Sequence, residues 1–251
     1  MINIKTPNEI SVMAESGRIL AEVLSEVLLS VKPGVSELEL DSLAERLIRE
    51  KGAESAFKRV KGYRHAICVS TNDTVVHGIP TDYRFKVGDV VGIDCGVYYK
   101  GFNTDVAHTV RVKSQNYDDI DKFLKIGETA LLEAIKQAKP GNRVGHISRT
   151  IQGIVEGAGY SVVRSLVGHG VGRQLHEEPE VPGFLTTKIE NTPLLRQGMT
   201  IAIEVIYNMG KPDVIYSNDD GWTIKTKDKS LSGLFERTIA VTKDGPLVLT
   251  K

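Results

Sequence analysis

The sequence predicts an α+β fold, because helical patterns come in pairs and each pair is followed by a run of β-rich segments. A second observation concerns internal symmetry. The order helix, Lys-Pro-Gly, helix, glycine occurs twice, and Pro33 and Pro140, like Gly52 and Gly159, are 107 residues apart. Chance repetition of common Pro-Gly turns is the alternative, but two matched positions favour a single domain, residues 1–251, built from related halves of about 1–112 and 113–251.

The two helices of the first half have clear start and stop signals. Thr6-Pro7-Asn8-Glu9 combines an N-cap threonine, a proline at the first helical position and the glutamate of a capping box. Apolar residues then recur at three- and four-residue spacing until Lys32-Pro33-Gly34 ends the helix. A second capping box, Ser36 with Glu39, opens a helix that closes at Gly52. Each helix therefore has one apolar stripe to bury.

The second half repeats this order before it turns to β-structure. Helical patterns run from about Ile120 to Ala138 and from about Val144 to Val155. Segments rich in β-branched and aromatic residues predict strands in both halves: Ala66–Ser70, Val90–Tyr98, Thr104–Val112, Ser161–Leu166, Met199–Tyr207 and Phe235–Thr242. The sequence contains no linker that would divide it into independent domains.

Composition and charge exclude several classes of protein. With 41% apolar and 25% charged residues, we expect a soluble globular protein rather than a disordered, collagen-like or coiled-coil one. The 32 basic and 32 acidic residues balance, which argues against nucleic acid as a partner. No segment has the pattern of a signal peptide or a membrane span. Because Cys68 and Cys95 are the only cysteines, we expect no disulfide framework and a cytoplasmic location.

Two aspartates lie in a predicted β-hairpin. Asp94 and Asp105 occupy strands joined by a tight turn near Tyr99-Lys100-Gly101. A turn centred between Tyr99 and Lys100 makes the aspartates cross-strand partners, with Cβ atoms about 4.5–5.5 Å apart. Like charges at that distance destabilise a sheet, so this placement predicts a raised pKa or a bound cation. A different register, or a loop position for one aspartate, is the alternative.

Two glutamates lie in predicted strands of the second half. Glu204 interrupts the apolar run 200–206, and Glu236 interrupts the run 234–241. A buried carboxylate needs a partner, which for Glu236 would ordinarily be a basic residue. Arg237 is poorly placed for this, because adjacent strand residues point to opposite faces. Four converging carboxylates call for divalent metal, and oxygen ligands suit manganese, iron(II), cobalt or magnesium.

Two histidines occur in a glycine-rich segment, residues 168–176. Its glycines permit close backbone approach and unusual dihedral angles, which predicts a tight loop that presents His169 to a site; an ordinary surface loop is the alternative. The segment matches neither the H-E-x-x-H zinc motif, despite His176, nor the dinucleotide fingerprint. His77 precedes a Gly/Pro turn and alone would more often be structural. The remaining histidines are expected to be structural: His65, His108 and His146.

Taken together, these residues resemble those of the type I, bacterial-type methionine aminopeptidases. The resemblance spans the chain through Thr6-Pro7-Asn8-Glu9-Ile10, Val76-His77-Gly78-Ile79-Pro80, the Asp94 and Asp105 hairpin, Gly168-His169-Gly170-Val171-Gly172, His176-Glu177-Glu178-Pro179, Glu204, Asp220-Gly221-Trp222 and Phe235-Glu236. It implies the pita-bread (creatinase/aminopeptidase) fold, in which two pseudo-symmetric halves surround a curved antiparallel sheet flanked by helices. It also implies removal of the initiator methionine from nascent proteins whose second residue is small.

The resemblance further implies roles for individual residues. Two divalent metal ions, which the family pattern leaves open among cobalt, manganese, iron(II) and zinc, would be held by Asp94, Asp105, His169, Glu204 and Glu236. The implied catalytic residues are His77, His176 and Glu204, and the two histidines would also contact the substrate. The positions that line the methionine pocket in the family are Phe57, Tyr63, Cys68 and Trp222, for which simple core packing is the alternative.

The chain departs from the usual bacterial pattern at Val60, Leu175, Val205 and Arg237. Because every implied ligand position is kept, these changes concern pocket width, specificity and rate. A proline-reading peptidase of the same fold, a type II methionine aminopeptidase and a non-catalytic binding protein are the alternatives. We expect a monomer that acts on the N-termini of nascent polypeptides, with a transient ribosome contact and no membrane association.

Overall fold

The structure is a computed structural model, and it describes residues 2–113, 118–217 and 220–251. Within these residues the α-helices are α1 (Pro7–Leu29), α2 (Glu37–Glu50), α3 (Asp119–Ile135) and α4 (Val144–Gly157), and short 3-10 helices cover Phe57–Arg59 and Ile189–Asn191. The capping boxes predicted at Thr6 and Ser36 are both present. Among the described residues, none of the helices combines the length and the apolar character that a membrane span requires.

The strands form two sheets. They are β1 (Glu54–Ser55), β2 (Ile67–Thr71), β3 (Thr74–Val76), β4 (Val90–Tyr99), β5 (Phe102–Arg111), β6 (Ser161–Val162), β7 (Val167–Gly170), β8 (Glu177–Pro182), β9 (Thr200–Asn208), β10 (Val214–Tyr216), β11 (Ile224–Thr226), β12 (Ser232–Thr242) and β13 (Gly245–Val248). In the described part of the chain, the larger sheet has ten strands in the order β1-β4-β5-β12-β9-β7-β8, with β2 on β4, β6 on β9 and β13 on β12. The smaller sheet has the order β10-β11-β3. The α+β prediction is confirmed.

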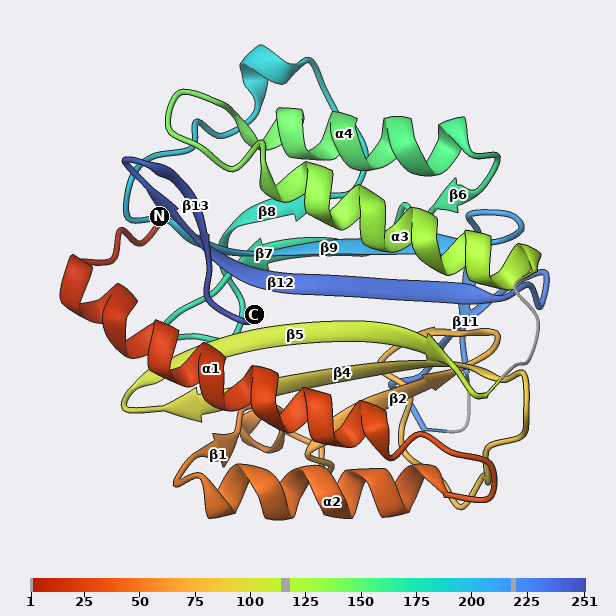
Figure 1. Cartoon of the computed structure of the whole chain (residues 1–251). Coiled ribbons are helices and arrows are strands. Elements are labelled where there is room, and N and C mark those ends of the chain that lie inside the picture. The colour runs from red at the N-terminus through yellow and green to blue at the C-terminus, as the bar shows by residue number, and fades with distance from the viewer. Residues whose placement is uncertain (1, 114–117, 218–219) are drawn as a thin grey trace.

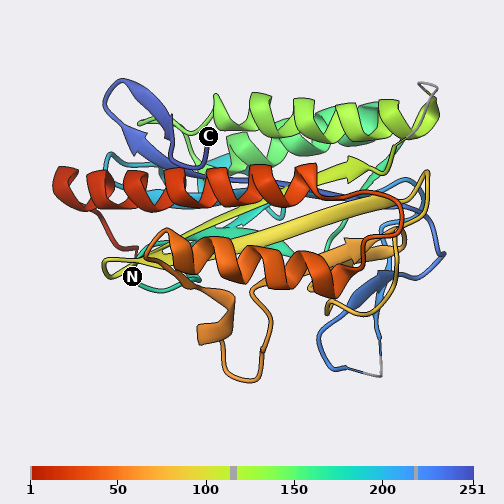
Figure 2. The same ribbon diagram turned by 60° about the horizontal axis from the view of Figure 1, so that its bottom comes forward.

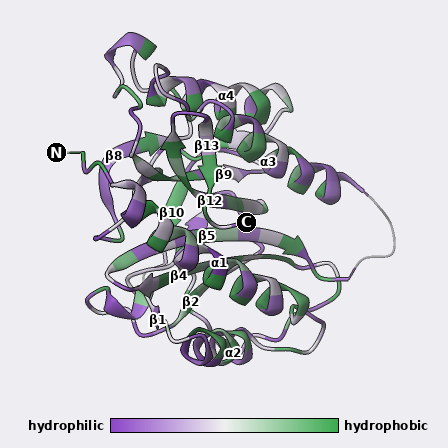
Figure 3. Ribbon diagram, turned by 60° about the vertical axis from the view of Figure 1, so that its left-hand side comes forward, coloured by the Kyte–Doolittle hydropathy of each residue, from purple (hydrophilic) through white to green (hydrophobic). Residues whose placement is uncertain are grey.

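Helices cover one face of the larger sheet (Figure 1). Helix α1 contacts β4 and β5, whereas α3 contacts β9 and β12. Two hydrophobic clusters fill the space between the layers, one built around Leu20, Leu40 and Ile93 and the other around Phe123 and Ile203. Figure 2 shows the segment near Phe57–Arg59 and the β10–β11 hairpin on the side of the sheet away from α3 and α4. The central strands are largely hydrophobic, and the helices carry both hydrophilic and hydrophobic positions (Figure 3).

The helix pairs agree with the repeat in the sequence. Helices α2 and α4 begin and end 107 residues apart. The matched glycines have left-handed backbone angles, with φ of 87° at Gly34 and 89° at Gly141, 72° at Gly52 and 87° at Gly159. The two groups of strands meet where β5 pairs with β12, through Glu236 opposite Ala107 and Arg237 opposite Val106.

The strand predicted at Ser161–Leu166 is wrong in length, because only Ser161 and Val162 pair with β9. Val163 and Leu166 instead pack in a small cluster with β3 and β9 residues. Their apolar character therefore reflects burial against that cluster, although the Val163 N–H still donates to Ile206 O of β9 at 3.0 Å. The pattern of a short buried run does not distinguish these two outcomes.

Candidate active site and metal centre

Asp94 and Asp105 lie on neighbouring strands, β4 and β5, but not opposite each other. The register pairs Asp94 with Ala107, so the predicted turn was placed one residue too early. The turn residues are Lys100 and Gly101, with φ of 48° and 90°. A two-residue hairpin loop favours positive φ at both central positions, which explains the shift. The aspartates remain on one face as diagonal neighbours, because the pairing moves by an even number of residues.

Glu204 and Glu236 lie directly opposite each other on β9 and β12. Because Glu236 also pairs with Ala107 of β5, the acids of both halves face the same space. The Arg237 guanidinium donates to the backbone carbonyls of Ala107 (3.2 Å) and Glu236 (2.7 Å) rather than to a carboxylate. These contacts agree with the prediction that Arg237 is poorly placed to pair with the Glu236 carboxylate, although its charge lowers the pKa of Glu236 to some extent.

His169 lies on strand β7, so the predicted loop is wrong. Gly168 and Gly170 do not have positive φ angles, so glycine is required there for space. A Cβ atom on residue 168 would lie 2.5 Å from the Ala202 carbonyl oxygen, and one on residue 170 would lie 2.3 Å from the Glu178 carbonyl oxygen. The glycines thus allow β7 to pair closely with β8 and β9. His169 pairs with Ala202, two residues from Glu204. Its Nε2 atom lies 3.5 Å from Oε1 of Glu204.

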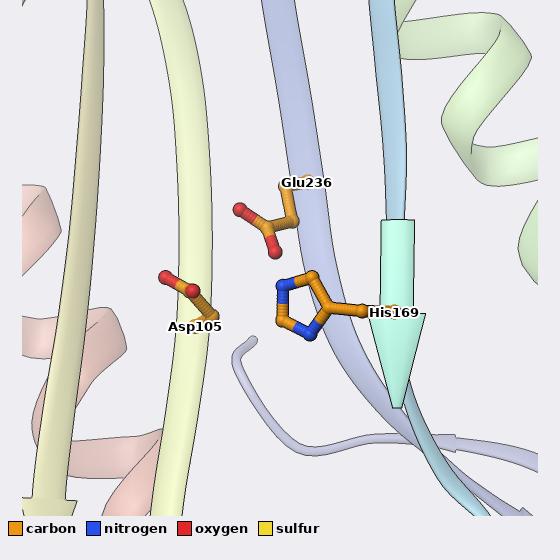
Figure 4. A group of neighbouring side chains, drawn as sticks. All are labelled: Asp105, His169 and Glu236. Carbon is orange, nitrogen blue, oxygen red and sulfur yellow. The ribbon is translucent and has the colours of Figure 1, made fainter. Parts of the chain in front are cut away.

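The side chains of Asp105, His169 and Glu236 converge from three strands (Figure 4). One ligand atom from each lies within 4.8 Å of the others. Asp94 Oδ1 and Glu236 Oε1 are buried without a hydrogen-bond partner among the described residues. Unpaired buried acceptors are costly, and divalent cations satisfy such oxygens. The donor set, carboxylates with one imidazole, therefore fits transition-metal ions.

The pKa values of the acids reflect their burial and their proximity to one another. Burial, followed by the charges of neighbouring acids, holds the pKa of Asp94, Glu204 and Glu236 well above the usual range. Burial also raises the pKa of Asp105 to about 7, although hydrogen bonds from Val106 N and Asp94 oppose the shift. A carboxyl cluster with raised pKa values in a cleft is typical of a functional site.

Desolvation in the pocket lowers the pKa of all three histidines of the site, which favours their neutral forms. Burial, reinforced by His176, lowers the pKa of His77 and lowers that of His169 to about 4. Burial alone lowers the pKa of His176. The Nδ1–H of His169 donates to the Gly170 carbonyl at 2.8 Å, since a carbonyl only accepts. This leaves the Nε2 lone pair of His169 directed at the acids, the arrangement common for metal-ligating histidines.

A pocket of about 110 Å³ joins the acids to an apolar wall. It is lined by every residue that the sequence predicted for the site, together with two of the positions noted as departures: Phe57, Val60, Tyr63, Cys68, His77, Asp94, Asp105, His169, Leu175, His176, Glu204, Trp222 and Glu236. The Tyr63 ring meets that of Trp222 edge-on at 5.2 Å and that of Phe57 at 6.2 Å. An apolar pocket that ends in convergent polar groups is the usual form of a small-ligand site.

The histidines expected to be structural lie outside this pocket. His65 bonds Asp41 at 2.9 Å, the ring of His108 packs on Phe235, and His146 accepts from Arg143 N at the start of α4. None of the three lines the pocket.

Two supporting residues were missed by the sequence reasoning. The Thr238 hydroxyl accepts from Asp105 N at 2.9 Å and donates to Asp105 O at 2.8 Å, which fixes the backbone of that acid. Asn103 donates to the carbonyls of Gly172 and Arg173 and so anchors the segment before His176. Threonine is common in strands and gives no signal there, and an asparagine, although depleted in strands, does not by itself show which carbonyls it contacts.

Comparisons with known proteins agree with this geometry. The pattern that defines metallopeptidase family M24 matches residues 11–243. The chain is 43% identical to a methionine aminopeptidase of Clostridium perfringens, over 100% of this chain and 99% of that protein. It is 42% identical to methionine aminopeptidase 1 of Bacillus subtilis, over the full length of both.

Solved structures give the same result. A methionine aminopeptidase of Thermotoga maritima superposes with a TM-score of 0.95 at 40% identity and covers 100% of both chains. A prolidase of Pyrococcus furiosus superposes with a TM-score of 0.79 at 26% identity, but the match covers 99% of this chain and only 65% of the prolidase. The pita-bread fold expected from the sequence is confirmed.

Proposed function

This chain belongs to metallopeptidase family M24 and, within it, to the methionine aminopeptidases, and from this premise we propose that it removes the N-terminal methionine from nascent proteins whose second residue is small. The enzyme is a metal-dependent hydrolase. The observation that carries the proposal is the single pocket in which an apolar wall meets the converging acids and histidines.

The acids and His169 supply the metal site of the proposal. Two divalent ions, cobalt, manganese, iron(II) or zinc, would be held by the carboxylates of Asp94, Asp105, Glu204 and Glu236 and by Nε2 of His169. The unpaired oxygens of Asp94 and Glu236 support this assignment. When bound, such ions polarise a carbonyl oxygen and lower the pKa of water.

The remaining polar residues of the pocket would bind and orient the peptide. The lowered pKa of His77 and of His176 favours the neutral imidazole, in which each ring has one N–H to donate to the peptide and to the oxyanion that develops during hydrolysis. Glu204, which lines the same pocket, would take a proton from water and pass it to the leaving amine.

The apolar wall would select the methionine side chain. Phe57, Tyr63 and Cys68 are each at most 7% exposed. Tyr63 donates its hydroxyl hydrogen bond to Ile67 O at 2.9 Å and lies 3.1 Å from the Cys68 sulfur, so the ring is fixed in place. Aromatic rings and a sulfur atom form favourable contacts with a thioether. Val60 and Leu175 also line the pocket, and because they are smaller than the aromatic residues of the usual bacterial pattern, they would leave it wider at these positions.

The proposal is tested by peptide cleavage. Metal-stripped protein is resupplied separately with Mn²⁺, Fe²⁺, Co²⁺ or Zn²⁺ and given Met-Ala-Ser, Met-Leu-Ser, Leu-Ala-Ser or Ala-Pro-Ser. We expect metal-dependent release of methionine from Met-Ala-Ser and little turnover of the other peptides. Cleavage of Ala-Pro-Ser instead would assign the chain to the proline-reading peptidases, and no turnover with any metal would contradict an enzymatic role.

The proposal extends to the setting in which the enzyme works. We place it in the cytoplasm, as a monomer that acts on nascent chains and touches the ribosome transiently. The cysteine usage supports the cytoplasmic location. The substrate itself supports the ribosome contact, since an initiator methionine is first exposed during synthesis. Size-exclusion chromatography and cosedimentation with translating ribosomes test the two associations.

A further inference from the structure

The N-terminal segment, residues 2–6 before helix α1, is bound to strand β8 by a buried ion pair. The Lys5 ammonium lies 2.5 Å from Oε2 of Glu177, and the side chains are only 4% and 2% exposed. Its side chains are the least exposed of any lysine or arginine ion pair in the described part of the chain; the next, Arg111 with Asp121, has side chains 13% and 25% exposed. A pair of this kind contributes little net stability, but loss of one partner leaves an uncompensated buried charge.

Each partner is held by further contacts. The Lys5 backbone N–H donates to the Gly198 carbonyl at 2.7 Å. The Lys5 side chain then crosses Gly172 so closely that a Cβ atom there would lie 2.4 Å from its Cε atom. Glu177 also accepts from Asn3 Nδ2 and Gln174 N, each at 3.1 Å. Burial alone would raise the pKa of Glu177, but the hydrogen bonds from Lys5, Gln174 N and Asn3 outweigh it and lower the pKa, so the carboxylate is ionised.

Glu177 connects this anchor to the pocket. It is the first residue of β8, directly after His176, and it pairs with Gly170, directly after His169. Neighbouring residues in an extended chain point to opposite sides, so the Glu177 side chain faces the N-terminal segment while His176 faces the pocket. The His176 and His169 rings are in edge contact, with centroids 4.4 Å apart. A displacement of Glu177 therefore moves His176 relative to His169.

We propose that Lys5, acting through Glu177, is a positioning residue that sets the orientation of the His176 ring in the active-site pocket. The inference rests on the proposed function, since it concerns a residue that would contact the peptide. Nothing in the chemistry of the reaction requires a lysine on the far side of β8. The Lys5 side chain is buried, passes close over Gly172 and shares the Glu177 carboxylate with two other donors. These contacts indicate that Lys5 fixes the position of Glu177, and with it the start of β8.

The test compares three variants of the full chain: Lys5→Met, Glu177→Gln and the double variant. With Met-Ala-Ser and Mn²⁺, we expect each single substitution to lower kcat by about 10–100-fold, as loss of a residue that orients a catalytic group does. KM should change by less than about threefold, because the apolar wall that binds the methionine side chain is untouched. The double variant should lose about as much kcat as one single variant, since the two residues act as a unit.

A second readout does not depend on activity. In metal-free, ¹⁵N-histidine-labelled protein, the ring signals of His176, identified with a His176→Gln variant, should shift in Lys5→Met and Glu177→Gln. The matched control is Arg173→Met, which breaks another ion pair between the same segments, Arg173 to Glu9 at 2.7 Å, in which Arg173 is 65% exposed. We expect this control to change kcat by less than about twofold, as exposed pairs contribute little, and to leave the His176 signals in place.

Two further results keep the outcome decisive. If Lys5→Met does not fold, Asn3→Ala takes its place, because it removes one donor to Glu177 and leaves the ion pair. This variant should lower kcat by roughly threefold, which corresponds to one hydrogen bond of about 0.7 kcal/mol. A lower melting temperature with wild-type kcat and unshifted His176 signals would overturn the inference and make the pair purely structural. If the wild type releases no methionine, the proposed function fails, and the histidine signals still decide the positioning role.

Discussion

At the scale of single residues, the acids of the candidate metal centre oppose the folding of the metal-free chain. Glu204 and Glu236 are direct cross-strand partners, and Asp94 and Asp105 are diagonal neighbours on the adjoining strands. Like charges across a sheet repel, and burial removes the water that would screen them. The same proximity that destabilises the metal-free site provides the oxygen ligands that a divalent cation needs.

A change at Asp94 separates these two effects. Asp94→Asn keeps the shape of the side chain, removes one charge and lets an amide donate to Asp105. We expect the metal-stripped variant to be more stable than metal-stripped wild type by roughly 1–2 kcal/mol. Wild type should gain about 2.7 kcal/mol of stability when the Mn²⁺ concentration is one hundred times the dissociation constant. The variant should not show this gain. Urea unfolding with EDTA and with Mn²⁺ measures both quantities.

The control for this prediction is Asp213→Asn, which removes one charge from an exposed aspartate away from the pocket. It should change neither stability by more than about 0.5 kcal/mol. A metal-stripped Asp94→Asn protein that is less stable than wild type would mean that the acids are satisfied without cations.

At the scale of elements, strand β7 depends on its glycines for close packing. A Cβ atom at Gly168 would collide with the Ala202 carbonyl oxygen at 2.5 Å, whereas one at Gly153, in helix α4, would meet nothing within 4 Å. We expect Gly168→Ala to destabilise the protein by about 1–3 kcal/mol through a backbone shift and to weaken Mn²⁺ binding, because His169 follows it. Gly153→Ala should stabilise by about 0.5–1 kcal/mol.

Thermal unfolding and a Mn²⁺ titration of both variants measure these effects. Since Gly168 and Gly153 receive the same added methyl group, the comparison separates steric collision from the general effect of alanine on the unfolded chain. Equal melting temperatures for the two variants would contradict the close packing of β7 on β9.

The elements that the sequence predicted well are those whose signal is local. Helices α1 and α2 begin at the capping boxes of Thr6 and Ser36, and the long strands β4, β5, β9 and β12 lie within a few residues of their apolar runs. The register of the β4–β5 hairpin was missed because it is set by positive φ at Lys100, a conformation that the sequence does not announce. Strand β7 was missed because its glycines give a loop signal, and only its neighbours reveal why they are needed.

The site residues were predictable for a different reason. Carboxylates inside apolar strands, such as Glu204 and Glu236, violate the rule that buried charges need partners, and that violation points to a cation. The wall residues Phe57 and Tyr63 violate no rule and were assigned only through the family resemblance. Lys5 and Glu177 gave no signal, since an ion pair between residues 172 positions apart is visible only after folding.

At the scale of the whole molecule, the active site lies on the junction between the two groups of strands. Strands β5 and β12 pair at only two positions, Glu236 with Ala107 and Arg237 with Val106. Threonine hydroxyls extend this short ladder on both sides. Thr238 bonds the N–H and carbonyl of Asp105, and Thr109 bonds those of Leu234 at 2.9 and 2.8 Å. We therefore propose that residues 1–251 form one domain whose halves, about 1–112 and 113–251, are held together next to the metal ligands.

This proposal predicts how the junction fails. Thr238→Val and Thr109→Val each leave a buried N–H and carbonyl without a partner. Each substitution should lower the free energy of unfolding by about 1–3 kcal/mol. Unfolding should remain a single transition, because neither half buries its strand edge alone. Thr129→Val, on helix α3 where the hydroxyl bonds only Lys125 O, should change stability by less than about 0.5 kcal/mol. Calorimetry of the three variants, with and without Mn²⁺, measures this. Metal should restore part of the lost stability in the Thr238 and Thr109 variants, since its ligands come from both halves. Two separate unfolding transitions would instead show that the halves fold independently and would overturn the single-domain proposal.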